Sequence, residues 1–188
     1  MRHTILVLIA ALPLLHGCAP LVIGGAAATG VLVAEDRRTV GTMTEDEGIE
    51  NKASNRIGDS LKTNIHVNVT SYNRAVLLTG EVPTAADKEQ AGRIARSVDN
   101  VRAVYNELAV SPVTSLSART NDTVTTSKVK ARFVDGQKFN AVHVKVVTEN
   151  GVVYLLGLVK KQEAADATDI TRTTSGVTRV VRLFEYID

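Results

Sequence analysis

The chain has 188 residues, 44% of them hydrophobic and 22% charged, a composition that indicates globular domains and not a disordered chain. A net charge of +2, with 4% aromatic residues and no Trp, argues against a nucleic-acid-binding surface. The single Cys excludes both an intramolecular disulfide and a zinc site built of several thiolates.

The first 17 residues have the features of an export signal. A basic start precedes an apolar run from Ile5 to Leu15, and Leu15-His16-Gly17-Cys18 resembles the bacterial lipobox, whose Cys is acylated. We therefore expect a signal peptide at 1–17, lipid attachment at Cys18, and a lipidated tether over 18–45. Ala19 stands where enteric lipoproteins retained in the inner membrane carry Asp. That resemblance predicts the periplasmic face of the outer membrane as the location.

A first module is predicted over residues 46–110. Ile49, Ala53, Ile57 and Leu61 recur every four residues, which is typical of a helix with one buried face. Alternating apolar and polar residues then indicate strands, and a Thr at position 84 begins a second helix as its cap. The predicted elements are a helix starting near 46, strands at 65–70 and 75–82, a helix at 84–97, and a strand at 101–110.

A second module is predicted over 121–188, after a Ser- and Thr-rich linker at 111–120. Asn150-Gly151 indicates a two-residue hairpin turn, because both central residues of that turn need positive φ. The predicted elements are a helix at 122–134, strands at 142–148 and 152–159, a helix at 162–173, and a strand at 177–187.

The two modules are copies of one unit. Residues 76–82 (VLLTGEV) return as 153–159 (VYLLGLV), 77 positions later, and His66 matches His143 at the same shift. A duplication of this length predicts two small domains and not a solenoid of short repeats. The predicted fold class is α+β, with two tandem αββαβ modules, each a three-stranded mixed sheet packed by two helices.

Each module resembles the BON domain, in which a leading helix precedes paired strands ending in L-x-G-x-V and a helix followed by V-x-x-V. From Cys18 to the C-terminus the chain resembles the dual BON-domain outer-membrane lipoproteins of the DolP/YraP type, most specifically at residues 148–151 and 155–159. The resemblance implies a non-enzymatic protein that supports envelope integrity and binds anionic, phosphatidylglycerol-like phospholipid through the first helix of its second module. It also implies association with division sites and with the outer-membrane β-barrel assembly machinery.

On a helical wheel, Thr126, Val129 and Phe133 share the side of this helix that suits the core. The opposite side carries a small apolar strip flanked by cations, and residues 123–139 have a net charge of +3. Such a face suits a headgroup interface. The predicted phospholipid-binding residues are Val124, Ser127, Lys128, Lys130, Ala131 and Val134. Val124 stands where the family tends to have Trp, and Lys130 matches a basic family position.

Two other interpretations of the sequence remain open. The charged helix face is also typical of ordinary solvation, and the chain also suits a protein-binding adaptor for outer-membrane assembly factors without direct lipid recognition. No cofactor, metal or nucleic acid is expected, and no catalytic motif is found. His66 and His143 are interpreted as solvent-facing positions, because no second His or paired carboxylate lies at ligand spacing.

Overall fold

The structure, a computed structural model, describes residues 36–61 and 64–188. Residues 37–188 form one compact unit. The predicted signal peptide, Cys18 and most of the predicted tether lie outside the described residues. None of the helices within the described ranges is long and apolar enough to cross a bilayer.

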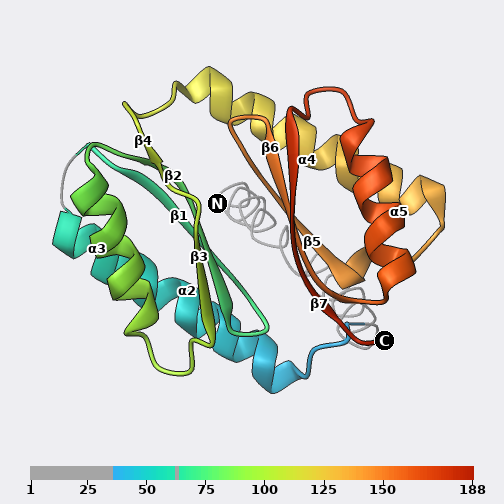
Figure 1. Ribbon diagram of the computed structural model, residues 1–188, viewed down its shortest axis with the longest axis horizontal. Helices are drawn as coiled ribbons and strands as arrows, with labels where there is room; N and C mark the ends of the chain where they lie inside the picture. The colour runs from blue at the N-terminus through green and yellow to red at the C-terminus, as the bar shows by residue number, and fades with distance from the viewer. Residues whose placement is uncertain (1–35, 62–63) are drawn as a thin grey trace, which may run out of the picture. The chain divides into compact units, whose positions relative to one another are not determined.

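The two αββαβ modules follow each other in the predicted order (Figure 1). The first contains α2 (Val40–Leu61), β1 (His66–Tyr72), β2 (Ala75–Val82), α3 (Ala85–Arg96), β3 (Ala103–Asn106) and β4 (Ala109–Val110). The second contains α4 (Leu116–Gly136), the short 3₁₀ helix η1 (Ala141–His143), β5 (Val144–Glu149), β6 (Val152–Val159), α5 (Lys161–Arg172) and β7 (Arg179–Tyr186). The predicted α+β class and tandem arrangement are confirmed.

Both sheets are mixed, as predicted. In the first, β1 pairs antiparallel with β2, and β2 pairs in parallel with β3 and, further along, with β4. In the second, β5 pairs antiparallel with β6, and β6 pairs in parallel with β7. Each module therefore places its central strand between a hairpin partner and a strand that returns after a crossover helix.

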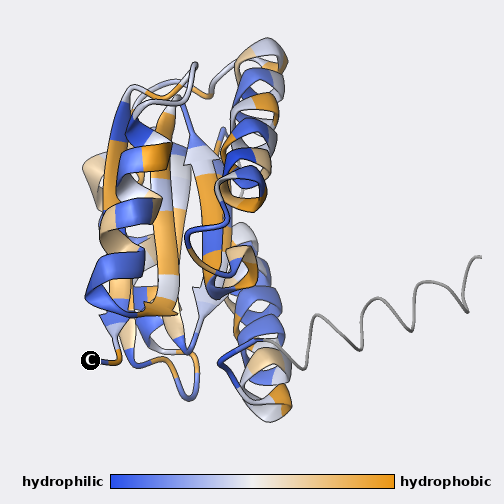
Figure 2. Cartoon of the chain, turned by 90° about the vertical axis from the view of Figure 1, so that its right-hand side faces the viewer, coloured by the Kyte–Doolittle hydropathy of each residue, from blue (hydrophilic) through white to orange (hydrophobic). Residues whose placement is uncertain are grey.

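One face of each sheet is covered by its own two helices (Figure 1). Successive side chains of a strand point to opposite faces, so alternate residues of the central strands fill two cores. Figure 2 shows strands that carry mostly hydrophobic residues, whereas the helices mix hydrophobic and hydrophilic ones. The helix-facing residues are Val76, Leu78 and Val82 on β2, and Val153, Leu155 and Val159 on β6.

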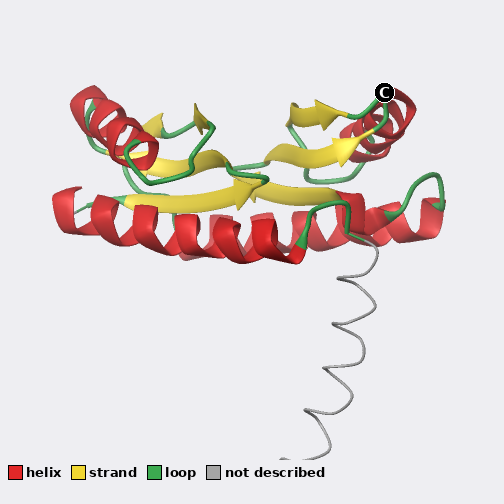
Figure 3. Cartoon of the chain, turned by 90° about the horizontal axis from the view of Figure 1, so that it is seen from below, coloured by secondary structure: helices red, strands yellow, loops and turns green. Residues whose placement is uncertain are grey.

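The opposite faces of the two sheets pack against each other. Tyr72 and Leu77 of the first module form a buried cluster with Tyr154 and Leu156 of the second, and we call this contact the junction. Figure 3 shows the strands of both sheets above a row of helices, with one further helix at the upper left and one at the upper right. Because β2 and β6 are buried on both faces, they read as nearly continuous apolar runs in the sequence.

Two helices begin earlier than the sequence predicted. The first starts at Val40, within the predicted tether, where the Thr39 hydroxyl accepts a hydrogen bond from the Thr42 amide at 3.1 Å. The second starts at Leu116, within the predicted linker, where the Ser115 hydroxyl accepts from the Ala118 amide at 3.2 Å. The sequence prediction was wrong at these ends because it followed apolar spacing, and the first turns of both helices are largely exposed.

Two predicted strands also differ. The strand predicted over 101–110 divides into β3 and β4, because Leu108 turns into the core and the Asn106 side chain donates to Lys88 O at 2.7 Å. The strand predicted from 142 begins instead with η1. The hairpin turn at Asn150-Gly151 is confirmed, with φ of 48° and 74°.

The repeated glycine of the two VxLxG-type segments has a steric cause. Gly80 has a φ of +108°, and a Cβ there would collide with the backbone oxygen of His66 on the neighbouring strand. At Gly157 a Cβ would meet the backbone oxygen of His143 in the same way. Each copy therefore needs glycine where the hairpin strands approach most closely.

Candidate functional site

Helix α4, the predicted lipid-binding element, packs on its own sheet through one face. Thr125, Val129 and Phe133 are buried, and the Phe133 ring meets Phe139 edge-on with centroids 5.0 Å apart. Thr126, expected on this face, is half-buried and donates to the Thr148 hydroxyl of β5 at 2.7 Å. The core-facing side of the wheel is therefore as predicted.

The opposite face of α4 is open to solvent. The exposed fractions of Val124 and Val134 are 47% and 62%. All six residues predicted to bind phospholipid are exposed: Val124, Ser127, Lys128, Lys130, Ala131 and Val134. The apolar strip is thus not buried against the first module, an arrangement that would have excluded the predicted role.

The early start of α4 adds a residue that the sequence analysis missed. Leu116 is 78% exposed. It lies 18 residues before Val134, which is five helical turns, so both side chains point in one direction. We call Leu116, Val124, Ser127, Ala131 and Val134 the outer strip, which extends about 27 Å along the helix at 1.5 Å per residue. In the sequence, Ser115, a residue type that favours the N-cap position, was the available signal that the helix starts at Leu116.

Residues 123–139 contain four cations, and two of them have protein partners. Arg132 donates from Nη1 to Ile170 O at 2.9 Å and to the Thr174 hydroxyl at 2.7 Å, so it ties α4 to the end of α5. Lys138 forms an ion pair of 3.2 Å with Asp166. These two side chains hold this part of the module to α5, and their charges are partly satisfied within the protein.

The other two cations lie beside the outer strip. Lys128 makes one long contact, 3.5 Å, with the Ser175 hydroxyl. Lys130 forms no hydrogen bond or ion pair with any residue that the structure describes. The charge available to a ligand on this face is therefore about two lysines, which is fewer than the net +3 of the segment indicates.

A buried carboxylate positions α4 on its hairpin. Asp122 accepts hydrogen bonds from the amides of Asn150 and Gly151, both at 2.8 Å. Asp46, 76 positions earlier, accepts from Asn73 and Arg74 amides at 2.8 and 2.7 Å in the first module. The duplication therefore preserves a contact between the first helix and the hairpin turn that the sequence analysis did not identify.

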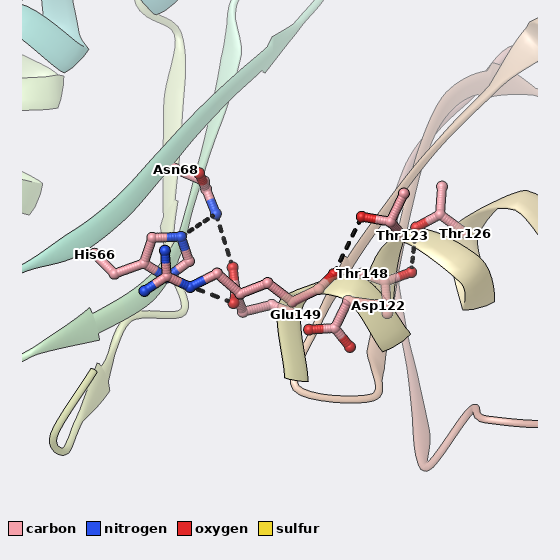
Figure 4. Close-up of a pocket in the computed structure, with 8 residues that line it drawn as sticks. His66, Asn68, Asp122, Thr123, Thr126, Thr148 and Glu149 are labelled. Carbon is pink, nitrogen blue, oxygen red and sulfur yellow. Dashed lines mark hydrogen bonds and ion pairs between the residues drawn. The ribbon is translucent and has the colours of Figure 1, made fainter. Parts of the chain in front are cut away.

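Polar residues gather at one side of the junction, and we call His66, Glu81 and Glu149 the junction cluster. His66 Nδ1 lies 3.0 Å from Glu81 Oε2 and 3.8 Å from Glu149 Oε1. Asn68 donates to Glu149 Oε2 at 2.9 Å, and Figure 4 shows His66, Asn68 and Glu149 together. Burial raises the pKa of Glu149, an effect that Asn68 and His66 partly oppose and Glu81 reinforces. The interpretation of His66 and His143 as solvent-facing was wrong, since both are largely buried.

Beside His143 the junction is organised differently. Arg37 binds both carboxylate oxygens of Glu163, at 2.6 and 2.8 Å, and donates to Leu158 O at 2.7 Å. Its guanidinium, with a smaller contribution from the Lys160 amide, lowers the pKa of Glu163 to about 2. The segment before α2 is thereby attached to the second module.

Comparison with known proteins agrees with this architecture. The BON domain model matches residues 45–112 and 121–188. The chain belongs to the BON-domain family. It is also 43% identical over 185 residues to the outer membrane lipoprotein DolP of Haemophilus influenzae, covering 97% of this chain and 95% of that protein.

More distant relatives have other names. A 21 kDa hemolysin of Actinobacillus pleuropneumoniae is 30% identical over 81% of this chain and 79% of its own length. The osmotically-inducible protein Y of Escherichia coli K12 is 31% identical over 80% of this chain and 77% of its own length. The chain is therefore a DolP-like, non-enzymatic BON protein among the outer-membrane lipoproteins of the cell envelope.

Proposed function

We propose that this protein is anchored by an acylated Cys18 to the periplasmic face of the outer membrane, where its second BON module binds anionic, phosphatidylglycerol-like phospholipid. Binding uses the outer strip of α4 and the two lysines beside it, Lys128 and Lys130. Through this contact the protein supports envelope integrity. Enrichment at division sites and contact with the outer-membrane β-barrel assembly machinery belong to the same proposal.

The observation that carries the proposal is the exposed outer strip. A helix that is buried on one face and shows Leu116, Val124 and Val134 on the other leaves apolar area without a covering element in the described chain. Such a face, with cations at its edges, fits the boundary between headgroups and acyl chains. An ordinary solvated helix face would be expected to carry polar residues at these places.

A hollow beside the helix offers room for a headgroup. It has a volume of about 390 Å³, and Val124 and Lys128 line it together with Asn150, Gly151 and Thr178. Lys128 and the hydroxyl of Thr178 can donate to phosphate oxygens, whereas the amides of Asn150 and Gly151 already donate to Asp122. The apolar side chains would then enter the acyl boundary while the phosphate remains near Lys128.

The binding free energy that the two lysines supply suits a protein that is already held at the membrane. Near an anionic surface each lysine contributes about 1 kcal/mol, so two free lysines contribute about 2 kcal/mol, or roughly a 30-fold gain. This is too weak for tight capture of a free protein. It is sufficient to orient a tethered one, because the anchor supplies a high local concentration of lipid.

Vesicle binding of residues 37–188 tests the proposal. We expect binding that rises with the phosphatidylglycerol fraction, falls with salt, and weakens about 10- to 100-fold in Lys130→Glu, which removes one cation and adds one anion. Lys52→Glu, an equal charge change on an exposed position of α2, is the matched control and should have little effect.

The apolar contribution has its own control. Val134→Ser should weaken binding, whereas Val40→Ser should not, although both valines are 62% exposed. Equal losses in both lysine variants, or binding indifferent to lipid charge, would refute lipid recognition by α4. Indifference to lipid together with a saturable protein partner would favour the adaptor function. Metabolic labelling with fatty acid, with Cys18→Ser as control, tests the anchor.

A further inference from the structure

The two matched histidines of the duplication have different surroundings. His66 lies on β1, and His143 ends η1 directly before β5. Near His143, the Tyr72 hydroxyl donates to the histidine's backbone oxygen at 3.4 Å, and the carboxylate of Glu163 already has Arg37 as its cation. His66 instead faces two carboxylates. The two copies therefore share the histidine but differ in the charged groups around it.

The sequence alignment of the two copies shows where the carboxylates come from. At the shift of 77, Glu81 corresponds to Leu158 and Glu149 corresponds to Tyr72. Neither carboxylate is thus part of the repeated pattern. The junction cluster is specific to one end of the junction, where β1 and β2 of the first module approach the end of β5 of the second.

The geometry of the junction cluster matches that of ligands around one metal ion. One atom from each of the three side chains lies within 4.8 Å of the other two. His66 Nδ1 is 3.0 Å from Glu81 Oε2 and 3.8 Å from Glu149 Oε1. Two ligands bound to Zn²⁺ at about 2.1 Å in tetrahedral geometry lie roughly 3.4 Å apart, so small side-chain movements suffice.

Burial and charge favour a cation at this place. Glu81 and Glu149 are only 2% and 8% exposed. Their other contacts are with neutral donors: Asn68 for Glu149, and the amide and hydroxyl of Thr114, both at 3.2 Å, for Glu81. Buried carboxylates are normally paired with cations or bound to metals.

One protein cation lies nearby. Arg119 lines the adjoining cavity, and its Nη2 donates to Thr114 O at 3.1 Å. Among the described residues it forms no ion pair with Glu81 or Glu149. A single guanidinium against two carboxylates leaves the cluster negative, so a divalent ion is still favoured electrostatically.

The cavity beside the cluster gives an ion access and room for water ligands. Its volume is about 170 Å³, and His66, Asn68 and Glu149 form one wall while residues of α4 form the other (Figure 4). A water molecule occupies about 30 Å³ of liquid, so the cavity has room for a metal ion and the water molecules that would complete its coordination.

We propose that His66, Glu81 and Glu149 bind one divalent transition-metal ion of the Zn²⁺ type, with water completing its coordination. One imidazole nitrogen and two carboxylate oxygens form a donor set that suits Zn²⁺ better than Mg²⁺, which prefers oxygen ligands only. Because the ligands come from both modules, the ion crosslinks them and stabilises the junction.

Zinc titration of the full chain in detergent, after treatment with a chelator, tests this site. By calorimetry we expect about one equivalent of Zn²⁺ to bind and thermal unfolding to move to higher temperature, with no such effect of Mg²⁺. His66→Gln and Glu149→Gln should each weaken zinc binding at least about tenfold. His143→Gln, the same substitution at the matched position of the other copy, should retain it.

Several results would overturn the proposal: no stoichiometric uptake, undiminished uptake in both cluster variants, or loss of uptake in His143→Gln. If neither cluster variant folds by circular dichroism, X-ray absorption of the zinc-loaded wild type decides. One imidazole with oxygen ligands supports the site, and two or more imidazoles overturn it.

Discussion

The contact between Asp122 and the β5–β6 turn makes a quantitative prediction about stability. Asp122 is 8% exposed, and each of its carboxylate oxygens accepts one amide, Asn150 N at Oδ2 and Gly151 N at Oδ1, both at 2.8 Å. In Asp122→Asn the shape is kept, but only one oxygen remains. The side-chain NH₂ then faces a backbone N–H, and neither donor finds an acceptor.

The cost follows from those two hydrogen bonds. A hydrogen bond to a charged group contributes about 1.5–3 kcal/mol, and a buried donor left without a partner costs about 1–3 kcal/mol. One bond is lost and the other loses its charge, so Asp122→Asn should lower the free energy of unfolding by about 2–4 kcal/mol. The backbone of the turn should remain in place, because Asn and Gly accommodate the positive φ values of 48° and 74° at positions 150 and 151.

Urea unfolding of residues 37–188 measures this loss, with Asp135→Asn as the matched control on an exposed position of the same helix. The control should change stability by about 0.5 kcal/mol or less. Amide hydrogen exchange at Asn150 and Gly151 should accelerate only in Asp122→Asn. A free energy of unfolding for Asp122→Asn within 0.5 kcal/mol of the control would refute the inferred role of the carboxylate.

Two further predictions concern the Arg37 contact and the repeated glycine. In the folded chain the pKa of Glu163 is lowered from 4.5 to about 2, so its pairing with Arg37 adds stability above the ordinary pKa that disappears as pH falls towards about 2. The melting temperature of Arg37→Gln should therefore be below that of the wild type at pH 7, with the gap closing in acid; a gap of constant size contradicts this. Gly80→Ala should lower the free energy of unfolding by more than about 2 kcal/mol, because of the φ of +108° and the collision of the new Cβ with His66. Gly48→Ala should raise it by about 0.5–1 kcal/mol, because a Cβ there meets nothing within 4 Å on helix α2. Similar effects of the two alanines in urea unfolding would count against the steric explanation.

Much of the architecture was predictable because it depends on local patterns. The alternation of apolar and polar residues along 65–70 and the short apolar runs at 75–82 and 152–159 predict strands. The turn chemistry of Asn150-Gly151 predicts a hairpin. The recurrence of Ile49, Ala53 and Ile57 every four residues predicts a helix with one buried face, and all three side chains are buried. Helix ends were less predictable, since the first turns of α2 and α4 contribute little to the core and their first apolar residues, Val40 and Leu116, are exposed.

The outer strip was predictable only in part. Val124 and Val134 follow from the helical wheel once the helix is placed, but Leu116 requires knowing that the helix starts at a Ser cap. The number of free cations was not predictable at all. Arg132 and Lys138 find partners on α5, a helix that is distant in sequence, and a charge count cannot recognise such contacts.

The sequence by itself determined the duplicated module, its order of elements and the face of each helix that meets its own sheet, because these depend on periodicity within short segments. Only the tertiary structure decided which strand faces meet at the junction. That contact brings together Glu81, Glu149 and His66, which are separated by up to 83 positions. Their proximity results from the packing of one sheet on another, and no spacing along the chain encodes it.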